Sequence, residues 1–391
     1  MNPSEPSSLL PGLAPGAEIL LVRLRSLGDI VLETPAIAAL HCWRPDLRIC
    51  VLVEPRFAAV LEGHPAVAEQ LFSGGFAGTA LALRRRRFPV VFNQHGGPRS
   101  ALLTAASGSP LRIGWKGFQF SFLYNVPVPD ANEFYGTRIV HAVEHRISQL
   151  YWAGLPRGPI PRAQVFPQVD AIESVVRLLA QKGIAPGRPY AVLQPGARLP
   201  TMRWPVEKFA EIARWLLETH GVASVVNLGA RDQAVAAAVR REMRDCAVAS
   251  EPFQLRELIA LVAASRIFVG NDSGPAHLAM AASRPSVVIF GSTNPAQWRP
   301  WRSEHRVVQT GAKFRWLRGD SSIVVRQPRS IQSIGIEEVR KACEALFAEG
   351  LVDTKWAERN PSDANRANRS RSAIASDETA GQIQPIEPHG S

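Results

Sequence analysis

The chain of 391 residues is long enough for two domains with separate cores, and its 46% hydrophobic and 20% charged residues are typical of a soluble globular protein. No apolar run approaches the roughly 20 residues that a membrane-spanning helix requires. Residues 1–16 lack the basic start and apolar core of a secretory signal, so we expect no export. The four cysteines are scattered without CxxC spacing, which argues against a zinc cluster or a disulfide framework.

The formal net charge of +11 indicates an anionic partner, such as a phosphorylated metabolite, a nucleic acid or an acidic membrane surface. The densest basic run, Arg84–Arg87, fits either an anion-binding surface or a solvated helix end. No zinc-finger spacing and no RNP-like aromatic strand accompanies it, so we expect no nucleic-acid partner.

Strands and helices alternate along both halves of the chain. The predicted strands are uniformly apolar instead of alternating, which favours parallel sheets covered on both faces. The predicted strands are Glu18–Val22, Arg48–Val53, Gln70–Phe72, Pro89–Asn93, Leu111–Gly114, Tyr190–Leu193, Ala223–Leu228, Arg266–Val269 and Ser286–Phe290. The predicted helices are Ile30–Cys42, His141–Ala153, Ala171–Lys182, Val206–Thr219, Asp232–Asp245, Leu255–Ser265, Ala276–Ala282 and Ile336–Ala348.

A proline-rich break at Leu155–Pro161 is the best candidate for an inter-domain linker. We therefore predict a flexible arm at 1–16, a Rossmann-like domain at 17–160, a second Rossmann-like domain at 161–350 and a polar, disordered tail at 351–391. The expected fold class is α/β, with two doubly wound domains that face each other across a cleft.

One strand-to-helix turn carries the clearest ligand signature. Residues 270–277 read Gly-Asn-Asp-Ser-Gly-Pro-Ala-His. Backbone N–H groups and the positive end of the helix dipole converge at such a turn, which suits a phosphate. Asp272 or Ser273 can cap the helix, and Pro275 fits its first turn. A matching turn at Arg23–Asp29 opens the chain, so we expect a phosphorylated ligand between two domains.

Two common phosphate motifs are absent, GxGxxG at the strand-to-helix turns and GxxxxGK[ST] anywhere in the chain. Dinucleotide dehydrogenases and P-loop NTPases are therefore disfavoured. There is no Asp-x-Asp pair and no His/carboxylate cluster with ligand spacing, so we expect neither a metal ion nor a cofactor. The remaining interpretation is a cleft that holds a nucleotide diphosphate and an acceptor.

Several short motifs, each on a strand-to-helix turn, occur in a characteristic order: Arg25–Asp29, Gln194–Ala197, Arg203–Pro205, Leu228–Ala230 and Asn271–His277. Together they resemble glycosyltransferase family 9, whose best-known members are the ADP-heptose:lipopolysaccharide heptosyltransferases. The resemblance covers residues 18–348. It implies the glycosyltransferase B architecture, with the donor in the C-terminal domain, the acceptor in the N-terminal domain, and an inverting transfer that needs no metal.

Asp29 lies where the first strand gives way to its helix, at the expected mouth of the cleft. The resemblance implies that it is the general base that deprotonates the acceptor hydroxyl. The residues alone favour an N-cap for the helix that follows. Gly28 either lets the acceptor approach the backbone or satisfies a turn torsion. Ser26 belongs to the same acceptor-binding turn.

On the donor side, Ser273, Gly274 and Pro275 form the expected phosphate turn. Asp272 would repel a phosphate, so we expect it to accept hydroxyl groups of the transferred sugar, with helix capping as the alternative. His277 either donates to a phosphate oxygen or a sugar hydroxyl, or is a packed histidine.

Arg203 is positioned to neutralise the departing diphosphate. The residue before it, often lysine in relatives, is Met202, which leaves the phosphate charge to Arg203 and its neighbours. Thr201 is expected to line the same pocket. Asp232 is a candidate to accept from the donor ribose, and helix capping explains it equally well.

The acceptor side is predicted from basic groups at strand ends. His95 and Arg99 follow the fourth strand, and Lys116 follows the fifth. Such groups suit an acceptor that carries carboxylates or phosphates, and solvated surface charge is the alternative for each of them.

The sequence as a whole predicts an inverting glycosyltransferase that moves a heptose from ADP-heptose to an anionic glycolipid of the lipopolysaccharide core. The alternatives keep the fold but use another nucleotide sugar or glycan acceptor, or bind nucleotide or glycan without catalysis. We expect a cytoplasmic protein whose positive charge allows peripheral contact with the inner leaflet of the cell membrane.

Overall fold

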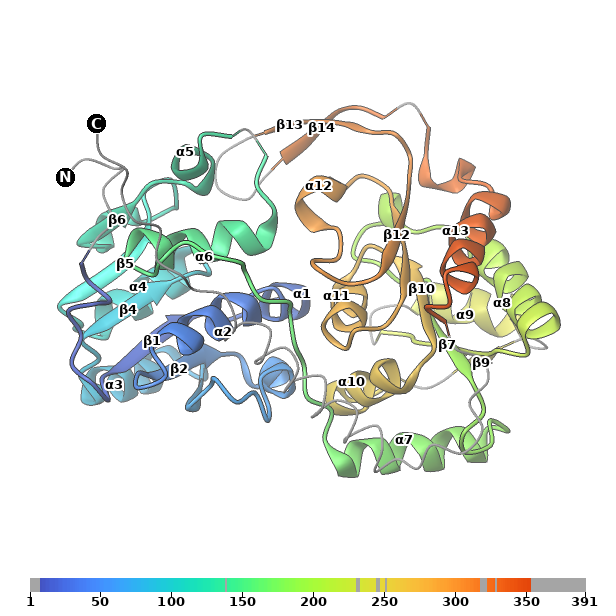
Figure 1. Ribbon diagram of the computed structural model, residues 1–391, viewed down its shortest axis with the longest axis horizontal. Coiled ribbons are helices and arrows are strands. Elements are labelled where there is room, and N and C mark those ends of the chain that lie inside the picture. Colours follow the sequence, from blue (N-terminus) through green and yellow to red (C-terminus); the bar gives the residue numbers. More distant parts are fainter. Residues whose placement is uncertain are drawn as a thin grey trace, which may run out of the picture.

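The computed structural model of the chain describes residues 8–137, 139–229, 233–243, 247–249, 252–316, 322–327 and 329–352. Two α/β domains lie side by side (Figure 1). The first sheet contains β1 (Glu18–Val22), β2 (Arg48–Val53), β3 (Glu69–Phe72), β4 (Val90–Asn93), β5 (Leu111–Trp115) and β6 (Val126–Val128). The second contains β7 (Tyr190–Gln194), β8 (Ala223–Val226), β9 (Val248–Ala249), β10 (Ile267–Asn271), β11 (Ser286–Phe290) and β12 (His305–Gln309).

The helices follow the same division. The N-terminal domain has α1 (Leu27–Val31), α2 (Thr34–Trp43), α3 (Phe76–Arg86), α4 (Pro98–Ala106), α5 (Ala131–Tyr135), α6 (Ala142–Trp152) and the 3-10 helices η1 (Pro55–Val60) and η2 (Ser121–Leu123). The C-terminal domain has α7 (Val169–Gln181), α8 (Val206–His220), α9 (Gln233–Glu242), α10 (Leu255–Ala264), α11 (Gly274–Ala281), α12 (Pro295–Trp298), α13 (Ile336–Ala348), η3 (Pro200–Met202) and η4 (Ile331–Ser333), with a small antiparallel pair of β13 (Lys313–Trp316) and β14 (Ser322–Arg326).

Both large sheets are parallel and have the same topology. Their strand orders are β3-β2-β1-β4-β5-β6 and β12-β11-β10-β7-β8-β9. When the strands of each domain are counted from its own first strand, both orders are the doubly wound 3-2-1-4-5-6. The predicted fold class, two Rossmann-like domains, is therefore confirmed.

Three of the four edge strands, β6, β9 and β12, escaped prediction because they carry weak strand signals. β6 is short and contains Pro127, which cannot donate to a ladder and is tolerated at a sheet edge. β12 begins and ends with polar residues, His305 and Gln309, and lies at the opposite edge of its own sheet. β9 has only two residues.

The predicted helix Ile30–Cys42 is wrong, because two helices occupy this segment. α1 ends at Val31 and α2 starts at Thr34. In a continuous helix the N–H of residue 35 would donate to the carbonyl of Val31, but Pro35 has no N–H. The Thr34 hydroxyl instead donates to the Val31 carbonyl, at 2.8 Å.

Residues 8–16 are packed and do not form the predicted flexible arm. Leu10 is fully buried, and its N–H donates to the carbonyl of Ala153 at 2.9 Å. The Arg44 guanidinium donates to the carbonyls of Leu10 and Leu13. This turn therefore belongs to the N-terminal domain. The predicted tail lies outside the described residues from position 353 on.

The N-terminal sheet is covered on both faces, as its apolar strands predict. α2 and α6 contact each other on one face, and α3 and α4 do so on the other, where Leu83 and Leu103 point into the core. The chain then crosses to α7 through residues 153–168, which include the predicted linker (Figure 1). No helix among the described residues has the length and apolar character needed to cross a membrane.

The two domains are in direct contact. α1 and η1 of the N-terminal domain contact α11 and α10 of the C-terminal domain, respectively, and a single cluster of buried apolar side chains extends from one domain into the other. Figure 1 shows α1 and α11 meeting at the centre of the molecule. The first helices after two central strands, β1 and β10, therefore face each other.

Candidate functional site

Glycines allow α1 and α11 to approach closely. A Cβ on Gly28 would lie 2.5 Å from Cδ2 of His277, and a Cβ on Gly274 would lie 2.9 Å from Cδ2 of Leu27. Neither distance leaves room for a side chain. Gly28 lies within a helix, and the His277 ring occupies the space where a Gly28 side chain would lie. Close packing against His277 therefore explains the glycine, in place of the two predicted reasons, acceptor approach and a turn torsion.

Asp29 is the third residue of α1 and not its N-cap, which corrects the capping alternative. Ser26 is the N-cap, and its N–H and hydroxyl donate to Oδ2 of Asp29 at 3.1 Å and 2.8 Å. This reciprocal arrangement is a capping box. Ser26 thus orients the Asp29 carboxylate, a role that the sequence did not predict for it.

Two arginines bind the other oxygen of Asp29. Nη2 of Arg146 lies 2.5 Å from Oδ1, and Arg23 forms an ion pair with the same oxygen. The Arg146 side chain is fully buried, whereas the Asp29 side chain retains 24% of its exposure. Burial alone would raise the pKa of Asp29, but the two guanidinium charges and the Ser26 hydrogen bonds outweigh it and hold the pKa well below its usual range. Asp29 is therefore an accessible, permanently charged carboxylate.

A second carboxyl group completes this cluster. Glu33 is fully buried, and neither of its carboxyl oxygens accepts a hydrogen bond from a described residue. Nε of Arg146 lies 3.8 Å from Oε2 of Glu33. Burial raises the pKa of Glu33 to about 7, against the opposing charges of Arg23 and Arg146. The cluster thus holds two arginines, one ionised carboxylate and one carboxyl group that titrates near neutrality.

Sequence reasoning missed Arg23, Arg146 and Glu33. Arg146 lies in α6, far from Asp29 in the chain, and meets it only because α6 packs against the first helices. One signal was available: α6 buries His145, Arg146 and Gln149 among its apolar residues. Buried charged residues are rare unless they are paired, so such a stripe marks a polar site.

No side chain of the described residues caps α11. Ser273 occupies the N-cap position, but its hydroxyl donates to the carbonyl of Asn271 at 3.0 Å. Pro275 stands in the first turn, where its missing N–H costs nothing. The start of α11, with Gly274, thus retains the dipole and the backbone donors that suit an anion.

Asp272 precedes this tip and does not cap the helix. Its carboxylate accepts a 2.5 Å hydrogen bond from the Thr293 hydroxyl. Burial raises the pKa of Asp272 to about 6, although the Thr293 hydrogen bond opposes the shift. Asp272 is therefore a buried acceptor, held away from the N–H groups of α11 by the loop that follows β11.

His277 is buried between the domains. It lies against Gly28, and burial lowers its pKa to about 4, with a further reduction from the charge of Arg146 and an opposing effect of Asp29. Its Nδ1 has no hydrogen-bond partner among the described residues. His277 is thus a neutral histidine packed beside the Asp29 cluster, and its donation to a phosphate oxygen or a sugar hydroxyl stays a prediction.

Asn271 ties the donor-side loops together at the end of β10. Its amide donates to the carbonyl of Pro195 at 2.8 Å, and its Oδ1 accepts from the N–H of Trp204 at 3.0 Å. The Trp204 indole is buried and donates to Ile334, so this tryptophan belongs to the core. Arg203, next to it, donates from Nε to the carbonyl of Ala197.

The remaining donor candidates differ in their surroundings. Thr201 is exposed and hydrogen-bonds Ser292 at 3.2 Å, while Met202 is buried. The carbonyl of Thr201 would be only 2.3 Å from a Cβ on Gly291, so the η3 segment packs tightly against the end of β11. Asp232 lies outside the described residues.

The acceptor candidates do not form one cluster in the observed contacts. His95 lies within electrostatic range of Arg23 and Asp29, and burial lowers its pKa to about 4. Arg99 instead donates to Ser73 and to the neighbouring carbonyl of Gly74. Lys116 forms an exposed 2.6 Å ion pair with Glu133. Of the three, only His95 is tied to the Asp29 cluster.

The fold and this site define a glycosyltransferase of the B architecture, with two Rossmann-like domains meeting at a carboxylate and a helix tip. Residues 79–315 match the model of glycosyltransferase family 9 (heptosyltransferase). Lipopolysaccharide heptosyltransferase 2 of Escherichia coli K12 is 26% identical over 325 residues, which cover 78% of this chain and 92% of that protein. The chain belongs to glycosyltransferase family 9.

Two solved structures have the same fold. The E. coli ADP-heptose lps heptosyltransferase II aligns with a TM-score of 0.69 at 25% identity and covers 85% of this chain and 99% of its own. A family 9 glycosyl transferase from Veillonella parvula aligns with a TM-score of 0.72 at 21% identity and covers 85% and 97%. The predicted family, fold and enzyme class are confirmed.

Proposed function

We propose that this glycosyltransferase transfers a heptose from ADP-heptose to a hydroxyl of an anionic lipopolysaccharide-core glycolipid, with inversion at the anomeric carbon and without a metal ion. The observation that carries the proposal is the meeting of Asp29, from the N-terminal domain, with the uncapped start of α11, from the C-terminal domain. The names of the relatives support the sugar, the nucleotide and the acceptor class.

Asp29 is the proposed general base. The acceptor oxygen attacks the anomeric carbon, the bond to the diphosphate breaks with its electron pair going to the phosphate oxygen, and the hydroxyl proton passes to Asp29. A carboxylate of low pKa is a weak base towards an ordinary alcohol. The hydroxyl becomes strongly acidic as its oxygen bonds to carbon, so a weak base that is always ionised suffices. Arg23 and Arg146 support this role because they keep the carboxylate charged and oriented.

The start of α11 is the proposed site for the leaving diphosphate. Its backbone N–H groups and helix dipole stabilise the negative charge that grows as the glycosidic bond breaks. Arg203 is held near this turn through Trp204 and Asn271, which supports a contribution to the same charge. Asp272 is the proposed acceptor for a sugar hydroxyl. Inversion follows from the proposed direct displacement, in which the acceptor oxygen attacks the anomeric carbon from the side opposite the departing diphosphate.

Metal-independent transfer is part of the proposal, and the positive charge near the site comes from side chains and a helix tip. Within the described residues, one trio of potential metal ligands comes together, Glu18, Cys50 and Glu69. The trio gathers around the start of β1, at the opposite end of the strand from Asp29, and Arg86 already pairs with both carboxylates at 2.8 Å and 2.7 Å. We propose that the arginines and the helix tip supply the positive charge that a metal ion provides elsewhere.

The test is to incubate the full chain with ADP-heptose and a lipopolysaccharide inner-core acceptor and to measure ADP release and the product mass. We expect stoichiometric ADP and a product heavier by one heptose, at a rate that EDTA does not change. UDP or GDP release from other nucleotide sugars would redirect the donor assignment. Tight nucleotide binding without turnover for any donor would overturn catalysis in favour of a binding protein.

A further inference from the structure

The outer face of α3 and α4 combines exposed apolar and basic side chains. Leu81 is 51% exposed on α3 and Leu102 is 44% exposed on α4. Phe122, on η2, is 79% exposed. α4 contacts both α3 and η2, so the three elements are neighbours. Large apolar side chains gathered at an exposed face of this kind mark an interaction surface.

The run Arg84–Arg87 divides its charges between two faces of α3. At 100° per residue, Leu81 and Arg85 point away from the buried Leu83, and Arg84 points sideways, toward Gly108. Arg86 points inward and pairs with two carboxylates beneath the helix. Among the described residues, no carboxylate lies within ion-pair distance of the exposed side chains of Arg84 or Arg85, and the same holds for Arg87, which ends the helix in a left-handed conformation.

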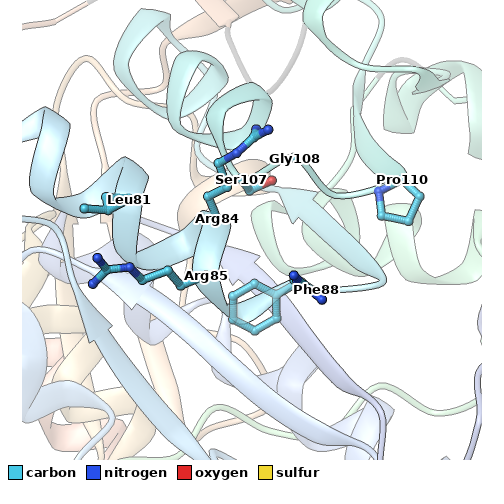
Figure 2. A pocket seen from close by; sticks show the side chains of 8 residues that line it. Leu81, Arg84, Arg85, Phe88, Ser107, Gly108 and Pro110 are labelled. Atoms are coloured by element: carbon cyan, nitrogen blue, oxygen red, sulfur yellow. The ribbon is translucent and has the colours of Figure 1, made fainter.

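These exposed arginines border a pocket of about 740 Å³ between the end of α3 and the end of α4 (Figure 2). Ser107 and Gly108 line it beside Arg84, and Leu81 also lines it. The guanidinium of Arg84 lies over Gly108, where a Cβ would be 3.1 Å from Nη1. The pocket offers guanidinium donors and an apolar border to one ligand. A phosphate attached to a hydrocarbon matches both features.

This surface is separate from the proposed catalytic groups. α3 and α4 begin at the carboxyl ends of β3 and β4, the edge of the sheet that faces the other domain, and they end at the opposite edge beside the pocket. The basic groups and the pocket therefore lie toward the edge of the sheet that is away from the other domain. Phe122 lies toward the same edge, since the carbonyl of its neighbour Leu123 accepts from Arg112 at the start of β5.

We propose that this face, made of Leu81, Arg84, Arg85, Arg87, Leu102 and Phe122, docks the enzyme on a bilayer of anionic lipids. The three arginines bind headgroup phosphates, and the three apolar side chains enter the interfacial region. The charge complementarity between unpaired arginines and an anionic leaflet favours a membrane over a protein partner. The inference rests on the proposed function only in that a glycolipid acceptor is membrane-borne.

The test is co-sedimentation of the full chain with vesicles of phosphatidylcholine alone and with vesicles of equal phosphatidylcholine and phosphatidylglycerol. We expect binding to the anionic vesicles. The triple variant Arg84→Gln, Arg85→Gln, Arg87→Gln lowers the partition coefficient about 100-fold, roughly fivefold per arginine. A matched control, Arg177→Gln, Lys182→Gln, Arg188→Gln, removes the same charge from exposed positions on and after α7 and keeps most of the binding.

The apolar contribution is tested at high salt, where headgroup attraction is screened. There the pair Leu102→Ser and Phe122→Ser lowers the remaining binding about 100-fold, in line with the transfer of two apolar side chains from water. Melting followed by circular dichroism shows whether each variant is folded.

Three results would overturn the proposal: no preference for anionic vesicles, equal losses in the triple variant and its control, or unchanged binding in both surface variants. ADP release with a detergent-free, water-soluble acceptor fragment is measured on the same samples and stays at the wild-type rate in the surface variants. If the wild type releases no ADP but its vesicle binding still depends on this face, the proposed function alone is rejected. If the wild type releases ADP but its vesicle binding does not depend on this face, the docking surface alone is rejected.

Discussion

The turn before α1 and the turn before α11 each lead from a central strand into a helix, but their polar groups are satisfied differently. At α1, the N-cap Ser26 is bound to Asp29, and Arg23 and Arg146 bind the same carboxylate. At α11, the N-cap Ser273 bonds back to its own turn. The α1 tip, the closed tip, therefore carries a charged side-chain cluster, and the α11 tip, the open tip, keeps its donors for a ligand.

This difference separates two ways of building a site. The α11 tip is made by consecutive residues, so its chemistry is visible in the sequence. The Asp29 cluster is assembled from β1, α1 and α6, and its electrostatics depend on tertiary packing. The proposed reaction needs both, because the closed tip supplies a fixed negative charge and the open tip receives a developing one.

The largest effect is expected from removing the carboxylate at the closed tip. Asp29→Asn should lower turnover roughly 10²–10⁴-fold, the usual range for a lost general base, while donor affinity stays within error. Steady-state ADP release and calorimetric ADP binding separate the two quantities. Near-normal turnover in both Asp29→Asn and Asp29→Ala would reject the assignment.

The next largest effect is expected from replacing Arg146, which binds the Asp29 carboxylate at the α1 tip. Arg146→Met should destabilise the fold by about 3 kcal/mol, because it removes the buried one of the two cations that Asp29 and Glu33 share and leaves only Arg23. Urea unfolding of the variant measures this loss. Arg177→Met, at an exposed position on α7, is the control and should change stability little. Equal stability of Arg146→Met and wild type would show that the cluster is not energetically coupled.

Glu33 predicts a pH dependence of stability. Its folded pKa of about 7 lies above the ordinary value of 4.5, so the folded state binds the proton more tightly. The resulting stabilisation is fully present below about pH 4.5 and is lost as the pH rises through about 7, amounting to about 3 kcal/mol. Asp272 shifts in the same direction, so the comparison needs a Glu33→Gln variant. Urea unfolding across this window should show a shallower pH slope in Glu33→Gln than in wild type, and identical slopes would contradict the account.

The smallest of these effects tests how the two tips meet. Gly28→Ala should cost about 1–3 kcal/mol, because the new methyl group overlaps the His277 ring. His277→Ala should relieve this cost in the double variant, which a double-mutant cycle of unfolding free energies measures. An additive cycle would mean that the two residues do not touch.

Sequence patterns predicted the framework and the local motifs. The bounds of β1 and β2 were predicted without error, because each is a continuous apolar run between polar residues. Asp29 and the 271–277 turn were found because each motif is contiguous. The break between α1 and α2 was missed, although Pro35 signalled it.

Other features depend on contacts that a single sequence does not encode locally. Arg146 reaches Asp29 across 117 positions, and Gly28 is needed for a histidine of the other domain. Arg99 and Lys116 were assigned to the acceptor from their positions at strand ends. Arg99 already donates to a hydroxyl and a carbonyl, and Lys116 already pairs with a carboxylate. A charged side chain at a strand end is thus a candidate ligand contact only until its hydrogen-bond and ion-pair partners within the protein are known.

The anomeric configuration of the product tests the central claim most directly, since that claim sets the base on one domain and the departing diphosphate on the other. Proton NMR of the newly formed linkage measures it. The account predicts a configuration opposite to that of the heptose in the donor. Retention of the donor configuration would contradict a direct displacement between Asp29 and the α11 tip.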